Sequence, residues 1–287
     1  MESLKEWAEK CAAEGVSLPE LAVKMQAQES FTAPETVRNE IKARLEIMRQ
    51  ARDKGMKSTV HSLSGLSGGG AYKMRAARRA GRLCADSLQA RAGETALAVA
   101  EYNASMGRIV AAPTAGACGI LPGVLFALEE EHGFSPDEMT DALLTAAVVG
   151  DVTARRATIS GAEGGCQAEC GTAAAMAAAA AVQLMGGSLR QCMDAVSFAL
   201  MNILGLVCDP VGGLVEVPCV YRNVSGAVGA IAAADLALSG IPAPLPADEM
   251  IDAMKNVGDL MPASLRETGE GGCAACPSAL KYLSGKA

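Results

Sequence analysis

Aromatic residues are scarce in this sequence: Phe, Trp and Tyr make up only 3% of its 287 residues. Positive charge is scarce as well, because the net charge is −7 and no basic block occurs. Proteins that bind nucleic acid need cationic patches and often stack aromatic side chains on bases. Nucleic acid is therefore not expected to be the main partner.

Long, strongly apolar runs are also missing. Residues 170–189 carry no charge, but Ala and Gly dominate them, whereas a membrane span needs ~20 strongly apolar residues. We therefore expect a buried helix of a soluble protein here and no membrane partner. The first seven residues are charged and lack the apolar core of a signal peptide, which favours a cytoplasmic location. In a reducing cytosol, the ten cysteines would bind metal, react or pack as small hydrophobic groups.

Half of the residues are hydrophobic, and the core must be built mainly from Ala, Leu, Val, Ile and Met. Ala, Leu and Met are good helix formers, so the composition predicts an all-α protein. Strand signals are limited to a brief alternation over Leu214–Val217. We predict one globular multi-helix domain over residues 56–287. A charged helical arm over residues 1–55 would precede it, either solvated or packed on a partner.

Capping boxes predict several helix starts, because a Ser or Thr followed three residues later by Glu or Gln satisfies free N–H groups. Such boxes are found at Ser17, Thr32, Ser135 and Ser188. The helix that starts at Ser135 is predicted to run to about Val149. Further helices are predicted over residues 2–13, 84–108, 224–239 and 247–258, and a Gly/Pro-rich loop over 112–123.

A loop rich in Gly and Ser runs from His61 to Gly70. Its successive N–H groups could form an anion-binding nest, which Lys73 would complete as a carboxylate or phosphate site. No Gly-Lys-Ser/Thr follows, so this is not a P-loop. A simple turn explains the glycines equally well. His61 is an acid/base candidate beside the loop, or a structural histidine.

Two Gly/Cys-rich loops flank the uncharged helix, one around Cys166 and one from Cys208 to Cys219. Glycine before Cys166 allows close backbone approach, and Pro218 fixes the loop before Cys219. Three thiolate ligands would leave one iron of a cubane cluster open as a Lewis acid. The spacing contains no CxxCxxC run, so buried structural thiols are the alternative. Cys170, at the start of the helix, is expected only to pack.

Other polar candidates have simpler explanations. Cys273-x-x-Cys276 could be a redox pair or half a zinc site, but only His61 and His132 exist to complete it, so ordinary small thiols are favoured. Four carboxylates in the cysteine loops could act as bases or orient ligands, or could instead pair with nearby arginines. These are Glu163, Glu169, Asp209 and Glu216, with Arg155, Arg156 and Arg222 as partners.

Four motifs together resemble the iron–sulfur-dependent L-serine dehydratases. They are Ser160-Gly-Ala-Glu-Gly-Gly-Cys166-Gln, Cys208-Asp-Pro-Val-Gly-Gly-Leu-Val-Glu-Val-Pro-Cys219 with Arg222-Asn223, Ala112-Pro-Thr114, and Ser64-Gly-Leu-Ser-Gly-Gly. The likeness covers roughly residue 20 to the tail. The chain looks like the separate α subunit of the two-subunit form, without the small β domain and its Ser-His-Thr loop.

The resemblance implies a 4Fe–4S cluster held by Cys166, Cys208 and Cys219, and a pyridoxal-free hydro-lyase (L-serine ammonia-lyase) that makes pyruvate and ammonia. Such an enzyme would serve amino-acid catabolism and gluconeogenesis with a β subunit as partner. The serine hydroxyl would bind the open iron. His61, or the partner's Ser-His-Thr loop, would remove the Cα proton. The substrate carboxylate would be held by Ser64, Ser67, Gly68, Gly69, Lys73 and Thr114.

The sequence departs from the family pattern near this pocket. Ala115 stands where Asn is usual, Cys118 replaces a small residue, and Gly70 replaces an acidic one. In some relatives a C-terminal cysteine occupies the open iron, whereas this chain ends in Ser-Gly-Lys-Ala287 and would need Cys273 or Cys276 for that role. An L-cysteine desulfidase with the same cluster is therefore a second hypothesis. A non-catalytic, thiol-rich helical subunit is a third.

Overall fold

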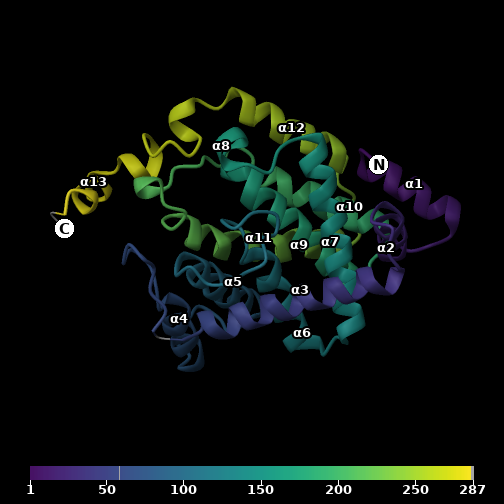
Figure 1. Ribbon diagram of the computed structural model, residues 1–287, viewed down its shortest axis with the longest axis horizontal. Helices are drawn as coiled ribbons and strands as arrows, with labels where there is room; N and C mark the ends of the chain where they lie inside the picture. The colour runs from purple at the N-terminus through teal and green to yellow at the C-terminus, as the bar shows by residue number, and fades with distance from the viewer. Residues whose placement is uncertain (58, 286–287) are drawn as a thin grey trace.

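The computed structural model describes residues 1–57 and 59–285, and the final Lys-Ala dipeptide lies outside them. The described residues form α-helices joined by loops and short 3-10 or π turns, with no β-strand (Figure 1). The all-α prediction is confirmed. The helices are α1 (Leu4–Glu14), α2 (Leu18–Glu29), α3 (Pro34–Gly55), α4 (Gly70–Arg79), α5 (Leu88–Ala104), α6 (Ile120–His132), α7 (Pro136–Arg156), α8 (Gly161–Gly164), α9 (Thr172–Leu184), α10 (Leu189–Met201), α11 (Cys219–Leu238), α12 (Ala247–Leu260) and α13 (Pro277–Leu283).

Helix α9 is the centre of the fold and confirms the predicted buried helix. Eight of its thirteen residues are alanine, and all but Gln183 are buried. Helices α6, α7, α10 and α11 pack around it. The short alanine side chains let these neighbours approach closely, as a densely packed interior requires. Within the described part of the chain, no helix has both the length and the apolar character needed to cross a membrane.

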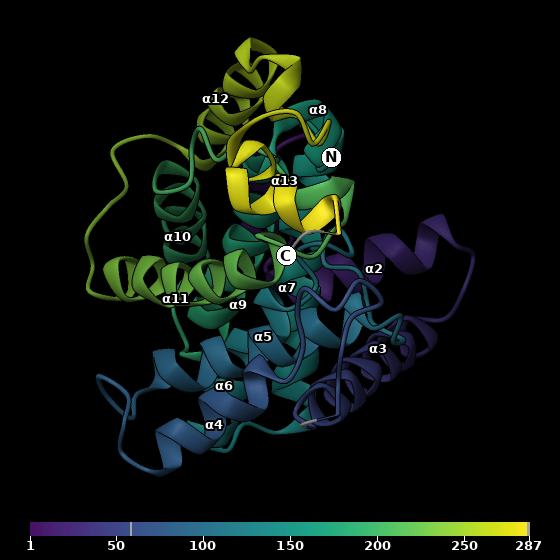
Figure 2. The same cartoon turned by 90° about the vertical axis from the view of Figure 1, so that its left-hand side faces the viewer.

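The N-terminal helices pack on this bundle. Helix α2 contacts α7, and the long helix α3 lies along α5 and α7 (Figures 1 and 2). Trp7, Leu21 and Met48 are buried in the same hydrophobic core as α9. Helix α3 ends at Gly55, where a side chain would overlap the Ala98 backbone. The division into an arm over 1–55 and a domain from residue 56 stays a prediction, because these contacts do not show whether either part folds alone.

The predicted helix starts are largely correct. Capping boxes form at Ser17, Ser135 and Ser188. The capping box at Thr32 is wrong: the residue before α3 is Ala33, which supplies no side-chain cap, and Pro34 opens the helix instead. Other boundaries differ from the prediction. The loop predicted over 112–123 ends earlier, because α6 starts at Ile120. Helix α5 covers only Leu88–Ala104 of the predicted 84–108, α7 continues past Val149 to Arg156, and α11 starts five residues early at Cys219.

Candidate active site

The structure brings together three of the predicted cysteines. Cys166 precedes a π turn that leads into α9, Cys208 follows α10 in a loop, and Cys219 is the first residue of α11. All three are buried, with 2%, 3% and 7% of their surfaces exposed. Burial raises the pKa of Cys219 to about 12, and the nearby Cys166 contributes to that rise. Burial, followed by Cys166, raises the pKa of Cys208 in the same way.

Cys166 differs from its neighbours because its thiolate is stabilised. Its Sγ atom lies 3.4 Å from that of Cys170. The hydrogen bond with Cys170 lowers the pKa of Cys166 despite burial, and the positive charge of Arg222 adds to the effect. Cys170 does pack in the core, as predicted, but it also contacts the first predicted ligand.

Arg222 on α11 is the cation of the site. Its Nη2 atom lies 2.7 Å from Asp209 Oδ1, and its Nη1 atom donates to the Val207 carbonyl at 2.8 Å. Burial would lower the pKa of Arg222, but Cys166 and Asp209 raise it. The predicted pairing of loop carboxylates with arginines is therefore confirmed for Asp209. It is wrong for the other three among the described residues: Glu163 accepts from Thr158, Glu216 accepts from two serines, and Glu169 has no arginine partner. Two other arginines pair elsewhere: Arg155 with Asp151 and Arg156 with Asp252.

Glu169 lies beside the thiols on the π turn. Burial raises the pKa of its carboxyl, and Thr114 partly offsets that rise. The Thr114 hydroxyl oxygen is itself buried and makes no close hydrogen bond to any described residue. A Cβ on Gly161 would lie 2.6 Å from Glu169 Oε2 and 2.9 Å from Cys208 Sγ. Only glycine therefore fits between the carboxylate and the thiol.

Asn223 joins the Thr114 loop to the cysteines. Its side chain is fully buried one turn into α11. The Oδ1 atom accepts a hydrogen bond from the Gly119 N–H at 2.8 Å, and Nδ2 donates to the carbonyls of Gly116 and Cys219 at 2.7 and 2.9 Å. A single amide thus holds both ends of the Gly116–Gly119 turn against the start of α11.

The glycine loop binds carboxylates that belong to the protein itself. The hydroxyl groups of Ser64 and Ser67 donate to Glu216 at 2.6 and 2.9 Å, and the Ser67 N–H donates to it at 3.0 Å. At the next turn, the N–H groups of Gly70 and Ala71 donate to Glu101 at 2.9 and 3.1 Å. These donors already have partners within the protein, and the predicted binding of a substrate anion by the loop stays untested. Because Glu216 lies between Cys208 and Cys219, the contact places the glycine loop beside the second cysteine loop.

His61 and Lys73 are exposed, and neither side chain takes part in these hydrogen bonds. A Cβ on Gly68 would meet the backbone of His61, so the histidine backbone rests on the glycine loop. Gly69 has a φ of 68°, a conformation that favours glycine. Among the described residues, no hydrogen bond or ion pair joins the His61 or Lys73 side chain to the cysteine loops. Their predicted roles stay untested.

The C-terminal segment covers the second cysteine loop. Cys208 N–H donates to Leu265 O at 2.8 Å, and Glu267 N–H donates to Cys208 O at 2.7 Å. Cys273 N–H donates to Asp209 Oδ2 at 2.6 Å, and Tyr282 on α13 donates to the Ser64 carbonyl at 2.6 Å. Figure 2 shows α13 on the side that faces the viewer. Cys273 is half-buried and Cys276 exposed, as expected for ordinary small thiols.

Sequence reasoning missed two buried carboxylates on α5, Glu94 and Glu101, which are 3% and 2% exposed. They lie seven residues apart and so on one face of the helix. The available signal was that each of these acidic residues stands within an alanine-rich, mostly apolar part of the helix. It could not reveal the partners, which come from a different part of the chain.

No group of three or more His, Cys, Asp or Glu side chains in residues 1–57 and 59–285 converges on a position for a single metal ion. The zinc alternative for Cys273 and Cys276 accordingly receives no support.

The burial of the cysteines predicts their reactivity in the metal-free protein. Cys84 and Cys276 are exposed, whereas burial raises the pKa of Cys192 to about 12. At pH 8 only ~10⁻⁴ of such a thiol is the reactive thiolate. Iodoacetamide should therefore modify Cys84 and Cys276 first, and Cys192 only after unfolding, as mass spectrometry of timed samples would show. Equal labelling rates for Cys84 and Cys192 would contradict the buried position of α10.

These features define an all-α protein with a buried polythiol site closed by its own C-terminal segment. The chain belongs to the serine dehydratase alpha chain family, which matches residues 13–274. It is 44% identical over 276 residues to the probable L-serine dehydratase, alpha chain, of Bacillus subtilis, covering 96% of this chain and 92% of that one. It is 39% identical over 274 residues to the L-serine dehydratase, alpha chain, of Peptoniphilus asaccharolyticus, covering 96% and 94%.

A longer relative shares only part of its sequence with this chain. L-serine dehydratase 1 of Escherichia coli is 46% identical over 181 residues, which are 62% of this chain but 40% of that protein. More than half of the E. coli protein therefore has no counterpart in the matched region.

Proposed function

We propose that this chain is the catalytic α chain of an L-serine dehydratase, which converts L-serine to pyruvate and ammonia. Its nearly full-length similarity to two proteins named as such alpha chains supports this assignment. The observation that carries it is the meeting of Cys166, Cys208 and Cys219 in one buried site beside Arg222. Arg222, which is paired with Asp209, also helps to lower the pKa of Cys166 and so favours the thiolate form that binds metal.

We assign these three cysteines as the ligands of a 4Fe–4S cluster. The donors fit such a group because all three are buried thiols, one with a lowered pKa, and no histidine competes. Gly161 packs against Cys208, where a larger residue would crowd the thiol. When bound, a cluster with one iron free of protein ligands supplies a Lewis acid that favours departure of a β-hydroxyl group. No pyridoxal phosphate is required.

The surrounding residues then have defined roles. Arg222 offsets the negative charge of the thiolates and, after the hydrogen bond with Cys170, helps to lower the pKa of Cys166. The buried Thr114 hydroxyl faces Glu169, whose pKa it lowers, but has no hydrogen bond within 3.5 Å among the described residues, so it is assigned to donate to the substrate carboxylate. The Glu169 carboxyl, whose pKa is raised by burial, holds or releases a proton at its Oε atoms beside Thr114. An unchanged KM for serine in Thr114→Ala would contradict the role given to that hydroxyl.

The other predicted residues are proposed to support the site or to act on the substrate. Ser64 and Ser67 hold Glu216, so the loop with Gly68 and Gly69 supports the pocket as a scaffold and orients the second cysteine loop. Lys73 remains a proposed carboxylate ligand and His61 the proposed base. Both side chains are exposed, so a second chain could enclose them.

A β chain is the proposed partner, and its docking face would border the cysteine site. Leu63, Leu214, Val215 and Tyr221 are large apolar side chains that are 82%, 43%, 40% and 51% exposed. They flank Ser64 and Cys219 in sequence, and Val215 approaches Gly116 in the loop that carries Thr114. The E. coli relative has additional sequence that could cover such a face. We further propose residues 56–287 as the catalytic domain, a cytoplasmic location, and a role in amino-acid catabolism and gluconeogenesis.

Anaerobic reconstitution tests the proposed function. The chain would be purified without oxygen, loaded with iron and sulfide, and assayed for pyruvate from L-serine and L-cysteine, with and without a candidate β chain. We expect about four irons and four sulfides per chain, and faster pyruvate release from serine. Faster release from cysteine would favour the desulfidase. A chain that binds no iron under any of these conditions would instead support the non-catalytic subunit.

A further inference from the structure

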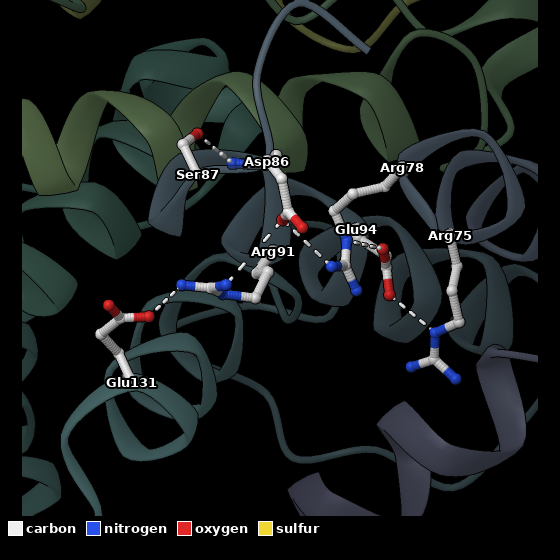
Figure 3. A network of polar contacts seen from close by, with 8 residues as sticks. Arg75, Arg78, Asp86, Ser87, Arg91, Glu94 and Glu131 are labelled. Atoms are coloured by element: carbon white, nitrogen blue, oxygen red, sulfur yellow. Dashed lines mark hydrogen bonds and ion pairs between the residues drawn. The ribbon is translucent and has the colours of Figure 1, made fainter. Parts of the chain in front are cut away.

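Helix α4 is fixed to α5 by the two buried carboxylates of α5. Glu101 accepts hydrogen bonds from the first N–H groups of α4, while Glu94 accepts from Arg75 Nε at 2.7 Å and Arg78 Nε at 2.9 Å. Figure 3 shows the Glu94 carboxylate between the two guanidinium groups. The orientation of α4 is therefore set at both ends by charge.

Next to this attachment lies a cleft of about 310 Å³ between α3, α4, α5 and α6. Five arginines line it, contributed by three different helices: Arg52, Arg75, Arg78, Arg79 and Arg91. Four carboxylates also line it: Asp53, Glu94, Glu129 and Glu130. One of them is already neutralised from outside the cleft, because Arg49 binds Glu129 through two hydrogen bonds of 2.7 and 2.8 Å. Arg78 and Arg91 are also paired from outside it, with Asp86 and Glu131. The positive charge left without a partner is therefore on α4, where Arg75 and Arg78 share Glu94 and Arg79 has no ion pair with a described carboxylate.

Several donors in the cleft have no partner among the described residues. Arg91 Nε is buried and makes no hydrogen bond. Arg75 uses only Nε toward Glu94, and Figure 3 shows its two outer nitrogens pointing away from that carboxylate. Arg79 forms no ion pair with any described carboxylate. A buried guanidinium donor without a partner is costly, so an acceptor in the cleft would stabilise the arrangement.

We propose that this cleft binds a small phosphate ester as an effector. Guanidinium groups match the geometry of phosphate oxygens, and the outer nitrogens of Arg75, the whole guanidinium of Arg79 and Arg91 Nε remain as donors for a doubly charged phosphate. The volume is at the lower limit for small-molecule sites, ~300 Å³, which suits a compact metabolite and is too small for a dinucleotide. The site is separate from the cysteine pocket, and its existence does not depend on the proposed dehydratase activity.

The cleft is connected to the cysteine site through α4 and the glycine loop, so a bound ligand would affect that site. A phosphate ester bound by Arg75 and Arg79 would hold α4, and the glycine loop leads directly into α4. That loop binds Glu216 through Ser64 and Ser67, between the predicted ligands Cys208 and Cys219. Occupancy should therefore reduce amide hydrogen exchange in residues 62–70, which lie outside the cleft itself.

Titration of the full-length protein with glycerol 2-phosphate tests the proposal. Calorimetry and hydrogen exchange would be measured at constant ionic strength, with potassium chloride as the reference salt. We expect saturable binding of one ligand per chain, and slower exchange over residues 62–70. Arg79→Gln should weaken binding about tenfold by removing charge-assisted hydrogen bonds. The double variant Arg75→Gln/Arg79→Gln should abolish it.

Arg44→Gln is the matched control, because Arg44 lies on α3 outside the cleft and pairs only with Glu40 on its own helix. It should bind the ester like the parent. Arg79→Gln removes an exposed side chain and should leave the fold intact even where the double variant does not. The proposal is overturned if potassium chloride at equal ionic strength gives the same heat, or if Arg79→Gln and Arg44→Gln bind equally well. Binding without any change in exchange over residues 62–70 would refute the effector role.

Discussion

Cys166→Ala is expected to eliminate cluster binding and to reduce pyruvate formation from serine by about 10³-fold or more, since loss of a Lewis acid removes several kcal/mol of stabilisation. The reason is local. Cys166 is one of only three thiols assigned to hold the cluster, and its removal leaves two. Iron and sulfide analysis after anaerobic reconstitution, together with the visible absorption spectrum, measures the loss directly.

Two matched variants make this result specific. Cys192→Ala removes an equally buried thiol from α10, away from the site, and should retain iron and activity. Cys170→Ala removes the thiol 3.4 Å from Cys166 Sγ and should also retain iron, because Cys170 is not assigned as a ligand. Full iron content in Cys166→Ala, or loss of iron in Cys170→Ala, would show that the ligand set is different.

Asn223→Ala should destabilise the protein by about 3 kcal/mol or more. The change removes three hydrogen bonds and leaves the Gly119 N–H and the Gly116 carbonyl without their buried partner, at ~1–3 kcal/mol for each unsatisfied group. For a chain of this size the Tm should fall by roughly 5–10 °C. The Thr114 loop would also lose its attachment to α11, so KM for serine should rise. Thermal unfolding monitored by circular dichroism measures the stability change.

Asn103→Ala provides the comparison. Asn103 donates to Ala115 O at 3.1 Å in the same loop, but it does so from an exposed position. Water replaces that bond, so the loss should stay below about 1 kcal/mol. Equal destabilisation by the two variants would mean that the turn is not held by Asn223 in particular.

Prediction from the sequence succeeded where the signal was local. The capping boxes at Ser17, Ser135 and Ser188 form because the residues that interact are only three apart. The capping box expected at Thr32 failed because Pro34 started the helix one residue later. The buried α9 could be recognised because an uncharged, alanine-rich segment has few other uses in a helical protein.

The candidate site was predicted only in part, for the same physical reason. Glycine and proline around Cys166 and Cys219 marked the loops, since these residues impose backbone geometry on their immediate neighbours. The pattern could not show that the glycine-loop donors are occupied by Glu101 and Glu216. Glu101 is 31 residues from its hydrogen-bond donor Gly70 in the sequence, and Glu216 is 149 residues from its donor Ser67.

The sequence by itself determined the helical class, the position of the central helix and the cysteine loops, because composition, periodicity and turn residues act over a few residues. Only the tertiary structure decided which charges meet. It paired Arg222 with Asp209 beside Cys166, set the C-terminal segment over Cys208, and left an arginine cleft beside Glu94. These contacts join distant segments, and burial strengthens them by excluding the water that would otherwise compete for each charge.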